Sequence, residues 1–357
     1  MSNSPMNRRQ FIAGTTALVA LSPLLRAGSL LTGKRMGVAH AAYAIRWKSE
    51  TPSTRYPGFS DALSMAEHCG KIGAGGVQLG TGGWKEGDAE NMKTICEKYD
   101  MYFEGQVQLP QSDSDVERFE KNIKNAADAG ATLVRTACLS GRRYENFESA
   151  DAFKSFKKEA IQSIRRAEPI IRKSRIRLAI ENHKDWMAAE LVAIIKEIDS
   201  EWVGVNLDFG NNISLLEEPM EVVKTLAPYS FTTHIKDMGV EEYEEGFLLS
   251  EVPLGEGILD LRQMIDICLK HNPGMTFNLE MITRDPLKIP CLTDKYWATF
   301  GDMSGKSLAQ TLSMVRKFSS EKGLPVIKNQ KPEKQLAVEE ENILSSFTYS
   351  RQTPGLY

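Results

Sequence analysis

The sequence is poor in the features that mark several large classes of protein. It has no long basic run, and 44 lysines and arginines against 47 aspartates and glutamates leave a net charge of -3. A chain without a basic patch lacks the electrostatic footprint of a nucleic-acid-binding protein. No glycine-rich phosphate fingerprint follows the first predicted strand. We therefore expect no nucleic-acid partner, and an open doubly wound sheet becomes the second choice of fold.

Cysteine is also scarce, and the five cysteines form no C-x-x-C pair. Cys69, Cys96 and Cys268 fall in predicted helices with mostly apolar neighbours, which is typical of buried thiols. An oxidising compartment would permit a disulfide, but the spacing indicates no particular pair. We expect none of the five thiols to be catalytic.

The N-terminal segment differs in character from the rest of the chain. In "NRRQFIAGTTALVALSPLL" the pair Arg8-Arg9 precedes an apolar run from Phe11 to Leu25, which Pro23 interrupts. A basic pair before a run too short to span a bilayer comfortably is typical of a twin-arginine export signal. We therefore expect residues 1–33 to direct a bacterial protein to the periplasm, with no stable membrane insertion after their removal. An uncleaved anchor or a chance basic pair is the alternative.

Short apolar strands alternate with amphipathic helices between residues 34 and 320, and no low-complexity linker divides this region. Helices of this length between strands imply parallel pairing through right-handed crossovers. Eight such units predict a closed (β/α)₈ TIM barrel, with residues 321–357 as a C-terminal extension. Pro169 should kink or break the helix that it interrupts. The predicted strands are residues 36–40, 75–80, 102–107, 131–137, 177–183, 202–209, 231–237 and 275–281.

The last four predicted strands carry small and polar residues at every second position. Side chains alternate between the two faces of a strand, so one set faces the barrel axis and the other faces the helices. The apolar set, such as Val203, Val205 and Leu207, suits the helix layer. The polar set should line the interior and comprises Ala179, Glu181, Gly204, Asn206, Asp208, Thr232, His234, Thr276, Asn278 and Glu280.

Four residues of this polar set lie near the carboxyl ends of successive strands: Glu181, Asp208, His234 and Glu280. Active sites of TIM barrels are built at that face, so these side chains should converge. Two glutamates, one aspartate and one histidine form a mainly oxygen ligand set for one divalent cation. Mn²⁺ is our first choice, with Mg²⁺, Co²⁺ and Zn²⁺ as alternatives. A single strand-end carboxylate is usually a loop-facing group, but repetition on four strands favours a metal site.

The segments "LAIENH", "VGVNLDFGN", "THIKD", "LGEGILD" and "FNLE" together resemble the xylose-isomerase-like superfamily of sugar isomerases and epimerases. The resemblance covers most of residues 36–320 and is strongest between 176 and 281. It implies that Glu181, Asp208, His234 and Glu280 bind one divalent metal. It also implies that Glu181 and Glu280 act as an acid/base pair on opposite faces of the substrate.

These residue types suit proton abstraction next to a carbonyl. A metal on the carbonyl oxygen acidifies the neighbouring C–H, and a carboxylate that removes this proton leaves an enediolate. We expect an isomerase or epimerase acting on a non-phosphorylated keto-sugar, since export disfavours sugar phosphates. A lyase, dehydratase or hydratase acting on a keto-sugar or inosose is the alternative. A non-catalytic sugar binder is less favoured, and so is an apurinic endonuclease, which would need more histidines than the five present.

Further residues are candidates for substrate contact: His183, Lys236, Arg284 and His40. His183 and Lys236 share the inward parity of their strands, whereas Arg284 can equally pair with Asp285, and His40 can equally be a structural hydrogen-bonded residue. The aromatic rings of residues 284–305 favour a lid over the sugar, with packing on the barrel rim as the alternative. The tail should either wrap the barrel or join a neighbouring subunit of a homo-oligomer.

Overall fold

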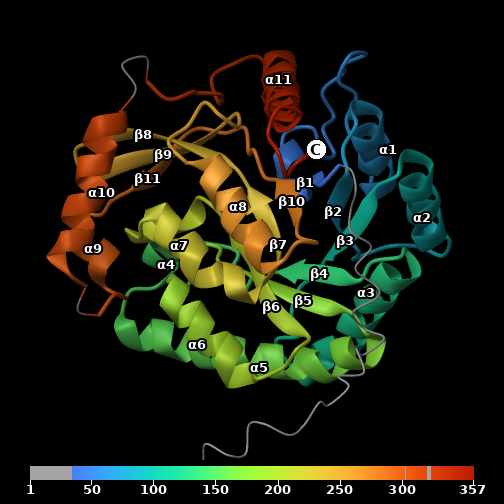
Figure 1. Cartoon of the computed structure of the whole chain (residues 1–357), viewed down its shortest axis with the longest axis horizontal. Helices are drawn as coiled ribbons and strands as arrows, with labels where there is room; N and C mark the ends of the chain where they lie inside the picture. Colours follow the sequence, from blue (N-terminus) through green and yellow to red (C-terminus); the bar gives the residue numbers. More distant parts are fainter. Residues whose placement is uncertain (1–33, 302, 320–322) are drawn as a thin grey trace, which may run out of the picture.

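The computed structural model describes residues 34–301, 303–319 and 323–357, and the predicted export signal lies outside them. Eight parallel strands form a closed barrel, surrounded by helices (Figure 1), and β10 pairs with β1 to close it. The predicted TIM barrel is confirmed, and each strand overlaps its predicted segment. The barrel strands are Met36–Ala39 (β1), Gly76–Gly80 (β2), Tyr102–Gln106 (β3), Leu133–Thr136 (β4), Arg177–Glu181 (β5), Val203–Asp208 (β6), Ser230–Ile235 (β7) and Thr276–Leu279 (β10).

Polar side chains meet across the barrel interior. Gln78 of β2 donates to Asn206 of β6 over 3.3 Å, although these strands are not neighbours. Glu104 of β3 likewise accepts hydrogen bonds from Thr232 of β7 and Asn278 of β10, each at 3.0 Å. Contacts between opposite strands require these side chains to point at the axis, so the predicted inward register is confirmed.

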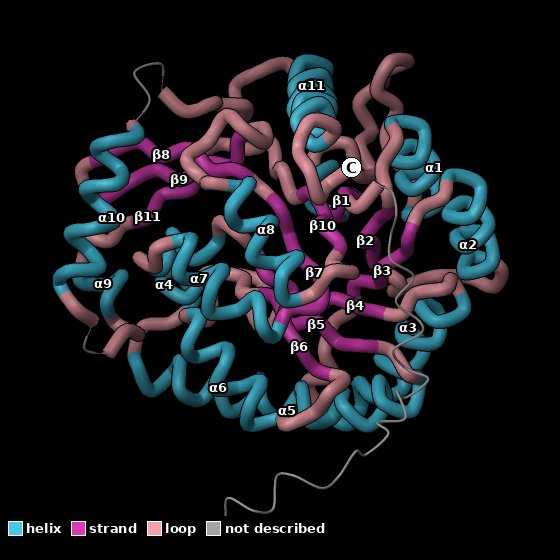
Figure 2. The backbone as a smooth tube through the Cα atoms, viewed as in Figure 1, coloured by secondary structure: helices cyan, strands magenta, loops and turns pink. Residues whose placement is uncertain are grey.

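Helices cover the outside of the barrel, as the tube in Figure 2 shows. In α6 the buried residues Leu191, Ile194 and Ile195 share one helical face, which packs toward the strands. The long helices between barrel strands are Ala62–Ile72 (α1), Asp88–Tyr99 (α2), Val116–Asp128 (α3), Ala150–Ser174 (α5), Ala188–Ile198 (α6), Pro219–Leu226 (α7) and Leu261–His271 (α8). Shorter helices are Arg143–Asn146 (α4) and the 3₁₀ turns His40–Tyr43, Asp113–Asp115, Asn211–Leu215 and Ala227–Tyr229.

Of the two predicted effects of Pro169, a kink or a break, the break is wrong, because α5 continues through this residue as one helix of 25 residues. A proline inside a helix leaves the carbonyl four residues earlier without its usual N–H partner. That carbonyl belongs to Arg165, and both residues lie on the exposed face of α5. Water can therefore donate the missing hydrogen bond, and the helix continues.

A small antiparallel sheet, which the sequence did not predict, extends one side of the barrel. It has the order β11-β9-β8 and is covered by α10, Gly305–Phe318. Tyr296 and Phe300 are buried in a second hydrophobic cluster beside this sheet, so these rings pack on the rim and do not form the lid that we expected. The added elements are Asp237–Tyr243 (β8), Gly246–Val252 (β9), Leu287–Ile289 (β11) and Asp294–Trp297 (α9).

The loop "LGEG" is a structural turn held by Asp237. The carboxylate of Asp237 accepts hydrogen bonds from the backbone N–H groups of Gly255, Gly257 and Leu259 at 3.0–3.1 Å. Gly255 has a φ of +86°, in the left-handed region that favours glycine. A Cβ atom at Gly257 would lie 2.1 Å from the Asp237 carboxylate, so only glycine allows this approach.

The described part of the C-terminal extension packs against the barrel. Helix α11, Pro332–Ser350, places Glu339 where it accepts hydrogen bonds from the backbone N–H groups of Ile45 and Arg46 at 2.7 and 2.9 Å. The carbonyl of Leu356 accepts hydrogen bonds at the start of β1. The tail therefore wraps the barrel, which is one of the two arrangements that we expected.

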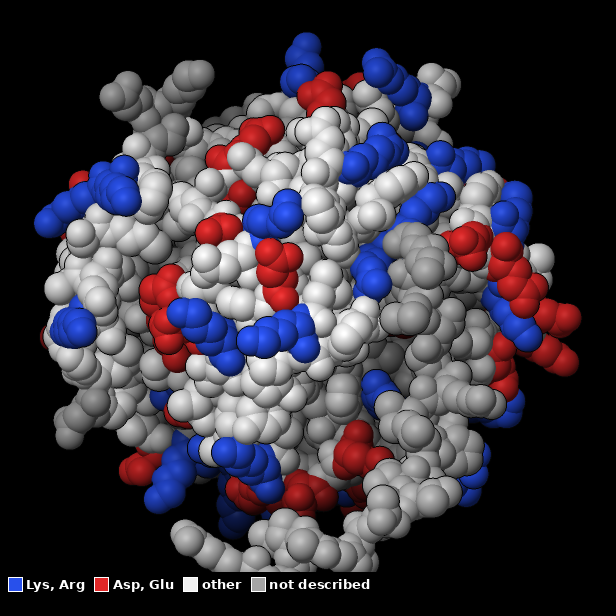
Figure 3. All heavy atoms as spheres, viewed as in Figure 1, with Lys and Arg blue, Asp and Glu red and all other residues white. Residues whose placement is uncertain are grey.

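Charged side chains of both signs, lysine and arginine with aspartate and glutamate, are mixed on the face of the molecule that Figure 3 draws. Among the described residues, no helix is both long enough and apolar enough to cross a bilayer. All five cysteines are free, and Cys69, Cys96 and Cys268 are buried thiols as predicted.

We expect Arg46→Ala to destabilise the fold by about 3–5 kcal/mol, since breaking a buried ion pair leaves a buried charge without its partner. Arg46 is 4% exposed, and its Nη1 donates to Glu340 of α11 over 2.8 Å. Urea unfolding followed by circular dichroism measures the change. Arg316→Ala is the control, because its pair with Glu242 is exposed and should contribute little. Equal effects of the two changes would contradict the role of Arg46 as an anchor of α11.

Candidate metal centre

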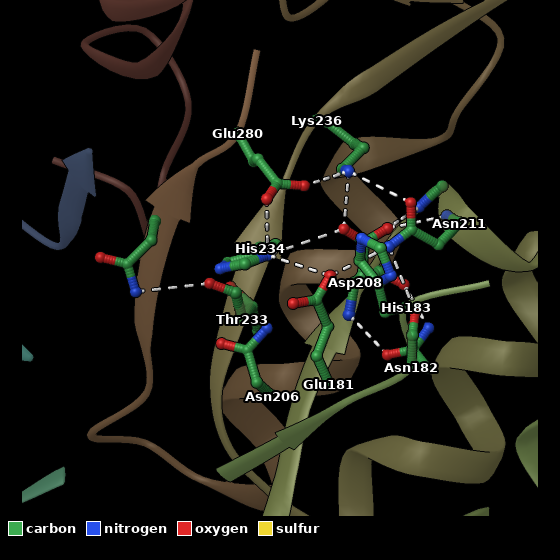
Figure 4. Close-up of polar contacts among 12 residues, drawn as sticks. Glu181, Asn182, His183, Asn206, Asp208, Asn211, Thr233, His234, Lys236 and Glu280 are labelled. Carbon is green, nitrogen blue, oxygen red and sulfur yellow. Dashed lines mark hydrogen bonds and ion pairs between the residues drawn. The ribbon is translucent and has the colours of Figure 1, made fainter. Parts of the chain in front are cut away.

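Four side chains converge at the carboxyl ends of the barrel strands, as the sequence predicted. Glu181 ends β5, Asp208 ends β6, His234 lies near the end of β7 and Glu280 directly follows β10. One ligand atom from each residue lies within 4.8 Å of those of the others. All four side chains are buried and point toward one another (Figure 4).

The Nδ1 atom of His234 occupies the middle of this cluster. It lies 3.6 Å from an oxygen of Glu181, 3.8 Å from one of Asp208 and 3.3 Å from one of Glu280. This buried nitrogen makes no hydrogen bond to any described residue. A nitrogen facing three carboxylate oxygens is a donor set that fits a divalent cation such as Mn²⁺ or Mg²⁺.

Gln78 fixes the orientation of the His234 ring by a hydrogen bond to its second nitrogen. The Oε1 of Gln78 lies 2.7 Å from His234 Nε2, so that nitrogen donates to Gln78 and Nδ1 is the ring nitrogen that faces the cluster. Gln78 is fixed in turn, because its amide donates to Glu104 over 2.9 Å. A histidine whose outer nitrogen is engaged in this way is the usual arrangement for a metal ligand.

Asp208 is held by the backbone and by a neighbouring asparagine. Its Oδ1 accepts hydrogen bonds from the N–H groups of Gly210 and Asn211 at 2.9 and 2.7 Å, which leaves Oδ2 for the cluster. Asn182 pairs with the Asp208 backbone, accepting from its N–H and donating to its carbonyl. Asn211 also donates to Glu181 over 3.1 Å, so it links two of the four residues.

Two cationic side chains offset part of the carboxylate charge. The Nζ of Lys236 pairs with Glu280 and lies 2.7 Å from Asp208. On the opposite side, Nη2 of Arg135, from β4, donates to Glu181. The sequence predicted Lys236 as a substrate contact, but the structure places its ammonium group in these buried ion pairs.

The electrostatics of the cluster keep the two glutamates ionised. Burial raises the pKa of Glu181, but Arg135 and His234 outweigh it, so the net pKa is lowered. Lys236 and His234 likewise outweigh burial and hold the pKa of Glu280 well below its usual range. Burial lowers the pKa of His234, but Glu280 and Glu181 raise it to about 9. A cation that binds Nδ1 therefore displaces a proton.

A cavity of about 850 Å³ adjoins the cluster over the carboxyl ends of β1 to β5. His40 and His183, two of the predicted substrate contacts, both line it. Burial lowers the pKa of His183 to about 4, so its ring is neutral at neutral pH. Arg284, another predicted contact, is not among the lining residues. Its guanidinium pairs with Glu251 at 2.5 and 3.1 Å and does not contact Asp285.

Several residues of the site were missed from the sequence. Gln78 and Arg135 come from β2 and β4, where a single polar residue within an apolar strand gave no repeated pattern. Lys184 follows β5 with a strained φ of +87°, and its buried Nζ donates to Asn211. Burial lowers the pKa of Lys184 to about 8. Gln78 and Arg135 share the inward face of the barrel, whereas Lys184 lies in the loop after β5.

The fold and the cluster define a TIM barrel with a candidate metal centre at its carboxyl-terminal face. The family model described as xylose isomerase-like TIM barrel matches residues 66–299, which is more than half of the chain. The chain therefore belongs to the xylose isomerase-like TIM barrel family, as the sequence resemblance predicted.

Comparison with individual proteins gives distant relatives and many structures of the same fold. The 3-oxo-isoapionate decarboxylase of Pectobacterium atrosepticum is 27% identical over 229 residues, which are 63% of this chain and 78% of that enzyme. The structure of D-psicose 3-epimerase with D-tagatose, from Clostridium cellulolyticum, superposes with a TM-score of 0.57 at 12% identity, covering 89% of this chain and 99% of that one. A xylose isomerase-like TIM barrel protein from Mycobacterium smegmatis, in complex with magnesium, gives 0.55 at 18% identity, covering 78% and 98%.

We expect Gln78→Leu to weaken Mn²⁺ binding by about 10- to 100-fold, because it removes the hydrogen bond that orients His234. Isothermal titration calorimetry of the purified protein with MnCl₂ measures the affinity. Gln108→Leu is the matched control, since Gln108 lines the cavity but is exposed and remote from His234 in the hydrogen-bond network. Unchanged Mn²⁺ affinity in Gln78→Leu would show that His234 needs no such support.

Proposed function

We propose that the protein is a divalent-metal-dependent enzyme that isomerises or epimerises a non-phosphorylated keto-sugar. The observation that carries this proposal is the convergence of four strand-end ligands around the Nδ1 atom of His234. Family membership supports it, because solved structures of the same fold include sugar epimerases. Mn²⁺ is the cation that we propose, and Mg²⁺ is supported by the magnesium complex of a structural neighbour.

When bound, the cation would polarise a carbonyl oxygen and acidify the C–H group next to it. Glu181 and Glu280 lie on opposite sides of His234 (Figure 4), so they can reach opposite faces of one substrate carbon. One carboxylate removes a proton from one face, and the other returns a proton to the opposite face, which inverts the carbon. Return of the proton to the neighbouring carbon by the first carboxylate gives isomerisation instead.

The surrounding cations keep both glutamates in the ionised form that a base requires. Lys236 and Arg135 each pair with one of them, and the lowered pKa of each glutamate keeps it ionised before the reaction. The burial of the cluster limits the access of water, which strengthens these interactions. His40 and His183 line the adjacent cavity as neutral hydrogen-bonding groups, and we propose that they contact the sugar hydroxyls.

We also propose that the protein is exported, on the basis of the Arg8-Arg9 pair and the apolar run that follows it. Sugar phosphates are normally cytoplasmic intermediates, so an exported enzyme is better matched to a neutral or oxidised sugar.

Decarboxylation of a 3-oxo sugar acid is the second candidate function, and the relative from Pectobacterium atrosepticum favours it. When a 3-oxo acid loses CO₂, the electrons of the broken C–C bond move to the carbonyl and leave an enolate. The cationic groups around Glu181 and Glu280 would stabilise that charge as well as they stabilise an enediolate. This reaction breaks a carbon-carbon bond, so it differs from the carbon-oxygen lyase that the sequence offered as the alternative.

We expect the Mn²⁺-loaded protein to introduce deuterium from D₂O next to the carbonyl of at least one ketohexose. A panel of D-fructose, D-tagatose and D-psicose, followed by proton NMR, measures the exchange. Glu181→Gln and Glu280→Gln should each slow it by about 100-fold or more, because each removes a general base. Glu244→Gln, at the exposed turn between β8 and β9, is the control and should exchange at the wild-type rate.

The same protein samples, given a 3-oxo sugar acid as well as the ketohexoses, separate the alternatives. A product lighter or heavier by one water would replace the isomerase with a dehydratase or hydratase. Release of CO₂ from a 3-oxo sugar acid, with no exchange into any ketohexose, would establish the decarboxylase. Sugar binding without exchange or product would leave a non-catalytic binder and refute both enzymatic proposals.

A further inference from the structure

Arg135 joins the cavity to the metal cluster. It projects from β4, lines the 850 Å³ cavity, and donates from Nη2 to Glu181. Register explains this position: Arg135 pairs with Ala179 on the neighbouring strand β5, and Glu181 is two residues further along the same inward face. A ligand in the cavity therefore meets Arg135 next to the carboxylate that we assign as a base.

The single partner Glu181 does not satisfy all the hydrogen-bond donors of the Arg135 guanidinium. This group carries five N–H donors, and the ion pair with Glu181 uses Nη2 alone. Its Nε is buried and makes no hydrogen bond to any described residue. The side chain is 11% exposed, so bulk water satisfies little of it. An arginine that lines a cavity and has N–H donors without partners is suited to a planar anion, which a guanidinium can bind through two parallel hydrogen bonds.

Arg135 is the cationic side chain on the inner side of the cavity, next to the metal cluster. Arg118, the other arginine of the wall, lies at the outer side, where it pairs with Asp115 over 3.3 Å and is 40% exposed. His40 and Gln106 add uncharged donors and acceptors. Apart from Asp115, the lining residues include no carboxylate that would repel a bound anion. Arg135 already shares its charge with Glu181, so the wall suits a single carboxylate group, whereas a phosphate dianion would call for more cations.

We propose that Arg135 binds a carboxylate of the substrate, and that the substrate is therefore an oxidised sugar bearing both an oxo group and a carboxylate. This inference rests on the proposed function, since it takes the cluster as the place where the oxo group reacts. It narrows the substrate class from keto-sugars in general to oxo sugar acids. The role of Arg135 is to select and orient this acid, while Glu181 and Glu280 move the proton.

The test compares 2-oxo-D-gluconate with D-fructose, which share a skeleton and differ by a carboxylate in place of CH₂OH at C1. Calorimetry on the Mn²⁺-loaded protein gives the affinity for each, and elemental analysis gives the metal content of each sample. In the wild type we expect 2-oxo-D-gluconate to bind tighter than D-fructose. In Arg135→Gln this preference should fall by about 10- to 100-fold, the contribution of a hydrogen-bonded charge.

Two further variants make the result specific. Arg135→Lys keeps a positive charge beside Glu181 but lacks the planar fork, so its preference should lie between those of the wild type and Arg135→Gln. Arg118→Gln should keep the wild-type preference. A wild type that favours D-fructose, or an equal preference in wild type and Arg135→Gln, would overturn the inference. Absence of bound metal in the wild type would instead refute the proposed function, so the two failures are distinguishable.

Discussion

The repulsion among three carboxylates buried side by side is the constraint on which the rest of the site depends. Glu181 and Asp208 are fully buried and Glu280 is 5% exposed, so water screens almost none of their charge. Ionised groups in such a setting are costly unless cations compensate them. Lys236, Arg135 and the proton of His234 supply that compensation, and a divalent cation would supply more of it. The neighbouring residues can be understood as the groups that hold these charges in place.

Support for the site comes from the polar interior of the barrel and not from its apolar shell. Glu104 accepts hydrogen bonds from three strands, its neighbour Gln78 orients His234, and Asn182 and Asn211 hold Asp208 and Glu181. Stability comes mainly from the outward faces, where strands such as β6 place Val203, Val205 and Leu207 against the helices. This division lets the axis of the barrel remain polar without loss of a continuous hydrophobic core.

The eight strands and the four clustered residues could be predicted because both produce a periodic pattern in the sequence. Alternation along the last four strands is enough to assign Glu181 and Glu280 to the inward face. Long-range partners produce no such pattern: Gln78 lies 156 positions from His234, and the pairing of Lys236 with Glu280 spans 44. The strands β8, β9 and β11 were missed because they pair with one another at the rim and do not follow the alternation of strands and helices that marks the barrel. The pairing of Arg284 with Asp285, one of its two predicted roles, is wrong because its actual partner, Glu251, lies in one of these strands.

Diffraction from crystals grown with MnCl₂, recorded just above the manganese absorption edge, tests the central claim most directly. The account predicts one strong anomalous peak bonded to Nδ1 of His234 and to carboxylate oxygens of Glu181, Asp208 and Glu280. Lys236 should have moved away from that position, because the cation takes over its role with Asp208 and Glu280. A peak bound elsewhere, or no peak at the cluster with Lys236 still in its ion pairs, would contradict the assignment of a metal centre.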